Sequence, residues 1–106
     1  MKLRQLAHAR TGDKGDTSNI SVIAYRHDDY ERLCAALSAA RVQAYLAGLF
    51  EAGDVPPGFQ VRRYELPGVA ALNFVVTGVL RGGVTRSLAL DAHGKTLGSI
   101  LLDLDV

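Results

Sequence analysis

The sequence predicts an α+β fold, an open-faced sandwich in which helices pack on one face of a mostly antiparallel sheet. Three observations favour this class: helical spacing of apolar residues between 30 and 50, extended stretches on both sides of that region, and a hairpin pattern at the C-terminus. The chain has 106 residues, 48% of them apolar and 22% charged, which suits one folded domain over residues 1–106 and excludes disorder for the bulk.

Two stretches near the N-terminus are predicted to be extended. Residues 3–9 alternate weakly between apolar and polar side chains, and residues 19–25 are apolar on both parities. The second stretch is either an interior strand covered on both faces, or a strand covered on one face with Ile23 at its rim.

Two consecutive helices follow in the prediction. Asp28 is expected to cap the first, with Glu31 three residues on, and Ser38 is expected to cap the second, which ends at Gly53. The apolar residues of both helices recur at i, i+3, i+4 and i+7: Tyr30, Leu33, Cys34 and Leu37, then Val42, Tyr45, Leu46, Leu49 and Phe50.

The middle of the chain is less clear-cut. Residues 53–58 are rich in proline and glycine and predict a loop, and residues 59–66 predict a strand. That strand needs either a bulge or apolar side chains on two faces, because its apolar residues change parity. Residues 69–81 favour a helix by spacing, although the valines and Thr77 argue for a strand because branching at Cβ is better tolerated there.

A β-hairpin is predicted at the C-terminus. Its strands would cover residues 84–90 and 98–106, and Asp91 to Gly94 would form a type I turn with glycine at the position that needs a positive φ.

Composition excludes several classes of function. A net charge of +1, without interleaved aromatic residues, argues against nucleic-acid binding, and no apolar run is long enough to span a membrane. The start of the chain lacks the apolar segment of a signal peptide, so a cytoplasmic location is expected. A single cysteine, Cys34, permits no internal disulfide and no cysteine-based zinc site, and it is expected to be a core thiol.

The strongest chemical signal lies in residues 8–19, interpreted as a glycine-rich loop. Gly12 and Gly15 would let backbone N–H groups converge, and Arg10 and Lys14 add positive charge, which suits a phosphate or a carboxylate. The loop has neither the Gly-Lys-Ser/Thr triplet of a Walker A motif nor the GxGxxG spacing of a dinucleotide fold. Residues 10–19 are therefore a candidate anion site, and no cofactor is expected.

Three residues of the same segment are candidates for acid–base chemistry. Asp13 and Asp16 have the chemistry to hold a hard cation or to act as a base, although their spacing resembles no EF-hand loop, and no metal site is predicted. His8 is expected to end the first strand beside the loop, which makes it the histidine worth testing. The alternative is an ordered turn in which the aspartates pair with Arg10 and Lys14, and spacing alone favours that alternative.

Two other features have both a structural and a functional interpretation. Gly82 and Gly83, between Arg81 and Arg86, either approach an anion or end a helix and start a strand. Asn73 lies in an apolar segment and is either a structural hydrogen-bonder or a ligand contact.

The residues HARTGDKGDTSNI at 8–20, with YELPGVAALNFVVTGVLRGGVTRSLALDAHGKTLGSILLDL at 64–104, resemble the AtuA-like small domain. That family is described as ferredoxin-like, and the domain also forms the C-terminal part of acyclic terpene utilisation AtuA proteins, behind a larger domain. The resemblance implies a stand-alone copy encoded beside a large subunit, acting in bacterial catabolism of acyclic terpenes or branched acids through coenzyme A thioesters. It implies no catalytic residue. The motif positions that it marks are Arg10, Gly12, Asp13, Lys14, Gly15, Asn19, Asn73, Gly82, Gly83, Asp91, Gly94 and Lys95, of which the last three also suit the hairpin turn.

Three functions follow as hypotheses. In the first, the domain is a companion subunit of a large AtuA-like protein and residues 10–19 help to bind a CoA thioester or another anionic small molecule. In the second, it is a self-assembling, non-catalytic module that forms a homo-oligomer. In the third, which is the least favoured, it is a small independent enzyme, and 106 residues offer little volume to enclose a substrate.

Overall fold

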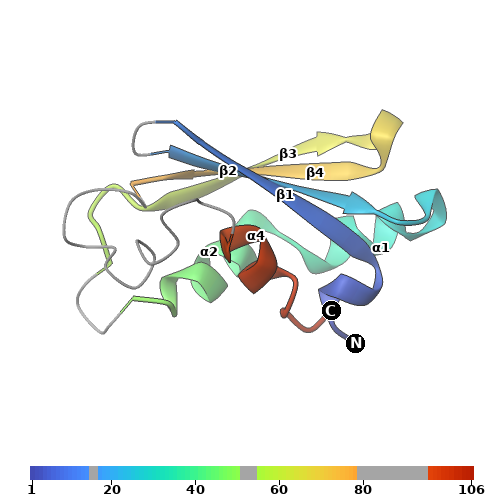
Figure 1. Cartoon of the computed structure of the whole chain (residues 1–106), viewed down its shortest axis with the longest axis horizontal. Coiled ribbons are helices and arrows are strands. Elements are labelled where there is room, and N and C mark those ends of the chain that lie inside the picture. The colour runs from blue at the N-terminus through green and yellow to red at the C-terminus, as the bar shows by residue number, and fades with distance from the viewer. Residues whose placement is uncertain (15–16, 51–54, 79–95) are drawn as a thin grey trace.

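The computed structural model describes residues 1–14, 17–50, 55–78 and 96–106. Four strands form one antiparallel sheet in the order β1-β2-β4-β3, and the helices lie on one side of it (Figure 1). The fold is therefore α+β, as predicted. The elements are the strands β1 (Ala7–Lys14), β2 (Thr17–Ala24), β3 (Gln60–Leu66) and β4 (Ala71–Thr77), the helices α1 (Tyr30–Ala36), α2 (Ala39–Ala47) and α4 (Thr96–Leu101), and the 3-10 turns η1 (Leu3–Gln5), η2 (His27–Asp29) and η3 (Pro67–Val69).

The two central strands show why the sheet is covered on one side. Ile20 and Val22 in β2, and Phe74 in β4, are fully buried and point to the same face, whereas the residues between them are exposed or half-buried. Ile23 is half-buried on the opposite face. Of the two interpretations of residues 19–25, the strand covered on one face is therefore the one observed.

The helices complete the core against that face. Their buried side chains fall at helical spacing, as in Leu33 and Leu37, so each short helix presents one apolar stripe to the sheet. Complete burial of a leucine contributes about 1.5–3 kcal/mol, so a handful of such residues accounts for much of the stability of a small domain. The fully buried leucines outside the strands are Leu3, Leu33, Leu37, Leu46, Leu97 and Leu101, the last two at 2% and 0% exposure.

The helix boundaries differ in part from those predicted. Ser38 caps α2, because its Oγ accepts a hydrogen bond from the backbone N–H of Arg41 at 3.1 Å. Asp28 is not a cap: it lies inside η2, and Asp29, at the N-cap of α1, makes no side-chain capping bond. The second helix ends at Ala47 with Gly48 as its C-cap rather than at Gly53, which is outside the described residues.

Residues 69–81 were predicted to favour a helix, and that prediction is wrong. Residues 71–77 form β4, which is hydrogen-bonded to β2 on one side and to β3 on the other. A strand puts Leu72, Phe74 and Val76 on one face, where all three are buried. The β-branched side chains that argued for a strand therefore decided the structure.

The predicted second strand of the C-terminal hairpin is also wrong. Residues 96–101 form α4, since Leu97, Leu101 and Leu104 are separated by four and three residues and are all buried. Gly98 allows this helix to approach β1 closely, and its backbone N–H donates to Thr11 Oγ1 at 3.0 Å. The predicted strand 84–90 and the turn at 91–94 lie outside the described residues.

Among the described strands, β1 and β3 lie at the two edges of the sheet. Residues 3–9 were predicted to be extended, but the strand begins at Ala7, after the turn η1. The pairing of β3 with β4 is regular from Gln60 to Leu66 and contains no bulge, so the change of parity means that apolar side chains lie on both faces. The edge of β3 is capped where Gln43 Oε1 accepts the backbone N–H of Val61 at 2.9 Å.

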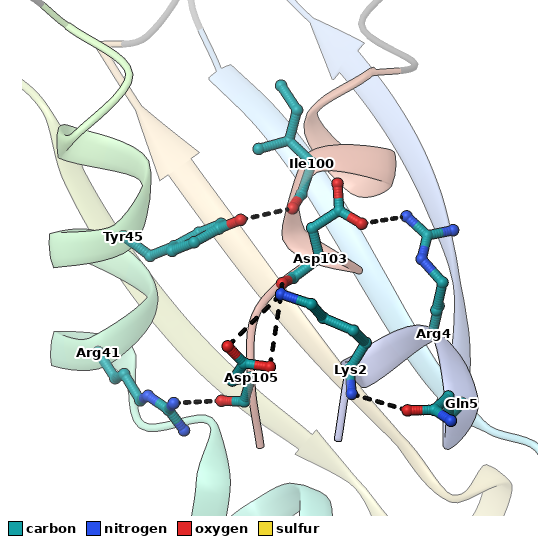
Figure 2. A network of polar contacts seen from close by, with 8 residues as sticks. All are labelled: Lys2, Arg4, Gln5, Arg41, Tyr45, Ile100, Asp103 and Asp105. Carbon is teal, nitrogen blue, oxygen red and sulfur yellow. Dashed lines mark hydrogen bonds and ion pairs between the residues drawn. The ribbon is translucent and has the colours of Figure 1, made fainter.

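The two ends of the chain lie side by side (Figure 1), and Val106 N–H donates to the carbonyl of Met1 at 2.8 Å. Figure 2 shows the polar contacts that surround them: Arg4 pairs with Asp103 at 2.5 Å and Lys2 with Asp105 at 3.4 Å. Arg41 donates to the carbonyl of Asp105, which connects α2 to the last residues. Exposed ion pairs contribute about 0–1 kcal/mol each, so these contacts position the C-terminal segment more than they stabilise it.

Gly78 provides a test of the close packing at the end of β4. Its φ is +77°, and a Cβ there would lie 2.5 Å from the carbonyl carbon of Gly58, so Gly78→Ala combines backbone strain with a clash. We expect a loss of about 2–4 kcal/mol in the free energy of unfolding, measured by urea denaturation. Gly68→Ala is the matched control, because a Cβ at Gly68 meets no atom within 4 Å and its φ is not positive. Equal stability of the two variants would contradict the close approach.

Candidate functional site

The candidate site lies on the face of the sheet opposite the helices, which we call the open face. Within the described part of the chain, α1, α2 and α4 all lie on the other side (Figure 1). Because successive side chains of a strand point to opposite faces, the alternate residues of each strand form this surface. They are His8, Arg10 and Gly12 of β1, Asn19, Ser21 and Ile23 of β2, Gln60, Arg62, Tyr64 and Leu66 of β3, and Asn73, Val75 and Thr77 of β4.

The register of the strands aligns these residues in rows across the sheet. One row crosses Arg10, Ser21, Asn73 and Tyr64, in the order β1, β2, β4 and β3. The next row crosses Gly12, Asn19, Val75 and Arg62. In these two adjacent rows every residue except Gly12 and Val75 is polar.

A hydrogen-bonded cluster occupies the centre of these rows. Asn73 Nδ2 donates to Asn19 Oδ1 at 2.5 Å and to Ser21 Oγ at 2.9 Å, joining β4 to β2. Both hydrogens of the Asn73 amide are then used, whereas the amide hydrogens of Asn19 and the hydroxyl hydrogen of Ser21 have no acceptor among the described residues. The structural interpretation of Asn73 as a hydrogen-bonding residue is therefore confirmed, and its role as a ligand contact stays a prediction.

The charge of the open face is positive. Arg10 on β1 and Arg62 on β3 are exposed, and among the described residues neither pairs with a carboxylate. No aspartate or glutamate occupies any of the open-face positions. An acceptor-rich anion is the ligand that such a surface favours, because every charged group on it is a hydrogen-bond donor.

The structure brings together four of the residues that the sequence singled out: Arg10, Gly12, Asn19 and Asn73. The expected loop 10–19 is not a loop, because residues 7–14 and 17–24 are paired strands. Gly12 is paired with Asn19 in this ladder, so its backbone is extended and does not form a nest; a Cβ there would meet open space.

Asp13 and Lys14 belong to the end of β1, where the ladder pairs them with Ser18 and Thr17. The other candidates lie outside the described residues: Gly15, Asp16, Gly82, Gly83, Asp91, Gly94 and Lys95.

A family model for the AtuA ferredoxin-like domain matches residues 1–106, the whole chain. The chain belongs to the AtuA ferredoxin-like domain family. Searches of curated proteins and of solved structures gave no significant match. The family agrees with the fold, a four-stranded antiparallel sheet with helices on one face, and it gives the protein an AtuA-related role.

Sequence reasoning missed three residues of the open face of this AtuA-type domain: Ser21, Arg62 and Tyr64. The strands that carry these residues were predicted, so alternation along each strand already indicates which of its residues share a face. The register that aligns β2 and β3 on either side of β4 could not be predicted, because β2 and β4 are far apart in the sequence (Ser21 and Asn73 are 52 residues apart) and no local pattern encodes their pairing.

His8 is the second residue of β1 rather than its last, as had been expected. Its ring stacks on Tyr25, with ring centroids 5.5 Å apart and an interplanar angle of 29°. Within the described residues no carboxylate pairs with this imidazole. The same part of the chain gathers no group of three histidine, cysteine or acidic side chains that could bind a metal, and none of its helices is long and apolar enough to cross a membrane.

A second polar group lies on the helical side, between α1 and β3. Arg63 donates to the backbone carbonyls of Cys34 and Leu37 at 2.8 and 3.1 Å and pairs with Glu65 at 2.7 Å. Cys34 is half-buried and packs against the core, close to its expected role as a core thiol. These contacts satisfy the last carbonyls of α1, so the group is structural.

The Tyr30 hydroxyl is buried without a hydrogen-bond partner among the described residues. Desolvation by burial, followed by the neighbouring Cys34 thiol, raises the pKa of Tyr30 above its ordinary value of 10.0. As the pH rises past 10, tyrosine in the unfolded chain ionises first while Tyr30 in the folded protein keeps its proton. The free energy of unfolding therefore falls as the pH rises from the unfolded pKa through the folded pKa, and this group has no such effect below about pH 9.

Tyr30→Phe tests this account. Removing a buried, unpaired hydroxyl should leave stability at pH 8 unchanged or raise it by up to about 1 kcal/mol. The variant should also lose less stability than the native protein between pH 9 and about pH 10.5, measured by urea unfolding. Tyr64→Phe, at an exposed position of β3, is the matched control and should keep the native pH dependence. A clear loss of stability in Tyr30→Phe at pH 8 would show that its hydroxyl is hydrogen-bonded.

Proposed function

We propose that this domain is the companion subunit or domain of a large AtuA-like protein in the breakdown of acyclic terpenes or branched acids as coenzyme A thioesters. The match of the AtuA ferredoxin-like domain to the whole chain supports the proposal, and so does the resemblance noted from the sequence, in which this domain follows a larger one in acyclic terpene utilisation AtuA proteins. In this arrangement the larger partner performs the chemistry and the small domain helps to hold the substrate.

One observation carries the proposal: Arg10, Asn19 and Asn73, singled out separately by the sequence, meet on one surface. Arg10 and Asn19 are exposed and Asn73 is half-buried, so these residues do not enclose a substrate by themselves. A second protein surface placed over them would exclude water and strengthen the contacts of Arg10 with an anionic group. Binding of an anionic thioester between two proteins is therefore the role that this geometry supports best.

Purification of a tagged copy from the native host tests the partnership. We expect a large AtuA-like protein to be recovered in stoichiometric amount. Recovery of the tagged protein alone, at physiological salt and with crosslinking before lysis, would contradict the companion role.

Turnover by the assembled complex tests whether the hairpin formed by β1 and β2 helps to bind the substrate. Arg10→Ala combined with Lys14→Ala should lower kcat/KM by roughly 10- to 100-fold, because two positive charges are removed from the strand that carries the proposed anion contact. Arg32→Ala, which changes an exposed arginine of α1 on the helical side, should leave turnover unchanged. Equal turnover by the double variant and the native complex would eliminate this role for the hairpin.

A second candidate function is a self-assembling module without chemistry. It is favoured by apolar side chains exposed at one end of β3 and the adjoining turn, since Tyr64, Leu66 and Val69 are 50%, 44% and 64% exposed. The occupant of that surface would be a second copy of this chain. Sedimentation that shows a monomer throughout the micromolar range would exclude this alternative.

A further inference from the structure

We infer that the open face binds a diphosphate group, with Arg10 and Arg62 on either side of the Asn19–Ser21–Asn73 cluster. The inference rests on the proposed function and deepens it, because it names the part of an anionic thioester that this domain contacts. It also assigns binding roles to two residues that the family motif does not mark, Ser21 in β2 and Arg62 in β3.

The arrangement of strands places the two arginines at opposite sides of the cluster. Arg10 is on the edge strand β1 and Arg62 is on the other edge strand, β3, one row further along. Neighbouring strands are about 4.8 Å apart, so the two edge strands are roughly 14 Å apart. Long arginine side chains on both edges can lean inward over the central strands, and there they would bracket a group a few ångströms wide.

The available hydrogen-bonding atoms between the arginines match an oxyanion. Asn73 donates both of its amide hydrogens to Asn19 and Ser21, which fixes the orientation of those two side chains. Their free N–H and O–H groups then point away from the cluster as donors. Phosphate oxygens accept hydrogen bonds and carry charge, so they match both the donors in the centre and the cations at the sides.

Two features of the described open-face positions also support the diphosphate site: the lack of a side chain at Gly12 and the lack of acidic residues. Gly12 is next to Asn19 in its row and has no side chain, and a Cβ there would meet no atom within 4 Å, which leaves room beside the cluster for a bulky group. At the described open-face positions no carboxylate competes for the arginines, unlike Arg63, whose guanidinium is already paired with Glu65.

Two separated cations favour a diphosphate over a single phosphate. A single phosphate can contact the central donors and one arginine, whereas two linked phosphates reach both sides and carry more charge. Because both arginines are exposed, salt screens their attraction, so binding should weaken strongly between 50 and 500 mM salt.

The experiment titrates the native protein with inorganic pyrophosphate, inorganic phosphate and coenzyme A, followed by calorimetry and by the backbone and side-chain amide signals in NMR spectra. We expect pyrophosphate and coenzyme A to bind, phosphate to bind at least several-fold more weakly, and the amide signals of Asn19 and Asn73 to shift. Arg10→Gln and Arg62→Gln should each weaken pyrophosphate binding by roughly 5- to 10-fold. Arg32→Gln, an exposed arginine of α1, is the control for net charge and should change binding less than twofold.

Three outcomes would overturn the inference: no binding of pyrophosphate at millimolar concentration, equal affinity for phosphate and pyrophosphate, or equal weakening by Arg32→Gln and Arg62→Gln. Native NMR dispersion in each variant excludes misfolding as the cause of a loss. The titration needs no partner protein, so it separates the two proposals. Pyrophosphate binding without recovery of a large AtuA-like protein supports the site and contradicts the companion role, whereas the reverse result contradicts the site alone.

Discussion

The structure depends on burial of only one face of its sheet. The side chains of β2 and β4 that point to the helices, such as Val22 and Phe74, are fully buried, and the apolar stripes of α1, α2 and α4 cover them. The hydrophobic free energy of the domain is therefore concentrated between one layer of helices and one layer of strands. Side chains on the opposite face are free from the demands of core packing, and this face carries Arg10, Asn19, Asn73 and Arg62.

Antiparallel pairing of β2 with β4 connects the fold to the candidate site. It joins the first hairpin to the second across a separation of more than 50 residues, and it creates the contact between Asn73 and Ser21. The same pairing makes β2 and β4 the interior strands, so their backbones are protected while β1 and β3 become the edges. The cationic side chains that flank the cluster come from those edge strands, where a long side chain has room to move.

Two errors of interpretation show where local patterns fail. Residues 71–77 combine helical spacing with β-branched side chains, and hydrogen bonds to strands on both sides settled the ambiguity. Residues 98–106 alternate like a strand, yet Leu97, Leu101 and Leu104 provide a helical stripe that packs on the core. In both segments apolar residues are so frequent that two periodicities fit, and only the tertiary partners distinguish between them.

The sequence by itself determined the α+β class, the strand over residues 19–25, the Ser38 cap and the family, because each is encoded in local spacing or in a contiguous motif. It also singled out Arg10, Gly12, Asn19 and Asn73 but gave no reason for them to lie together. Only the tertiary structure decided that residues 10–14 are part of a strand, that Ser21 and Arg62 share a face with them, and that no acidic residue occupies the described positions of that face. The physical reason is strand register, which depends on burial and backbone pairing between distant segments rather than on any local property of the chain.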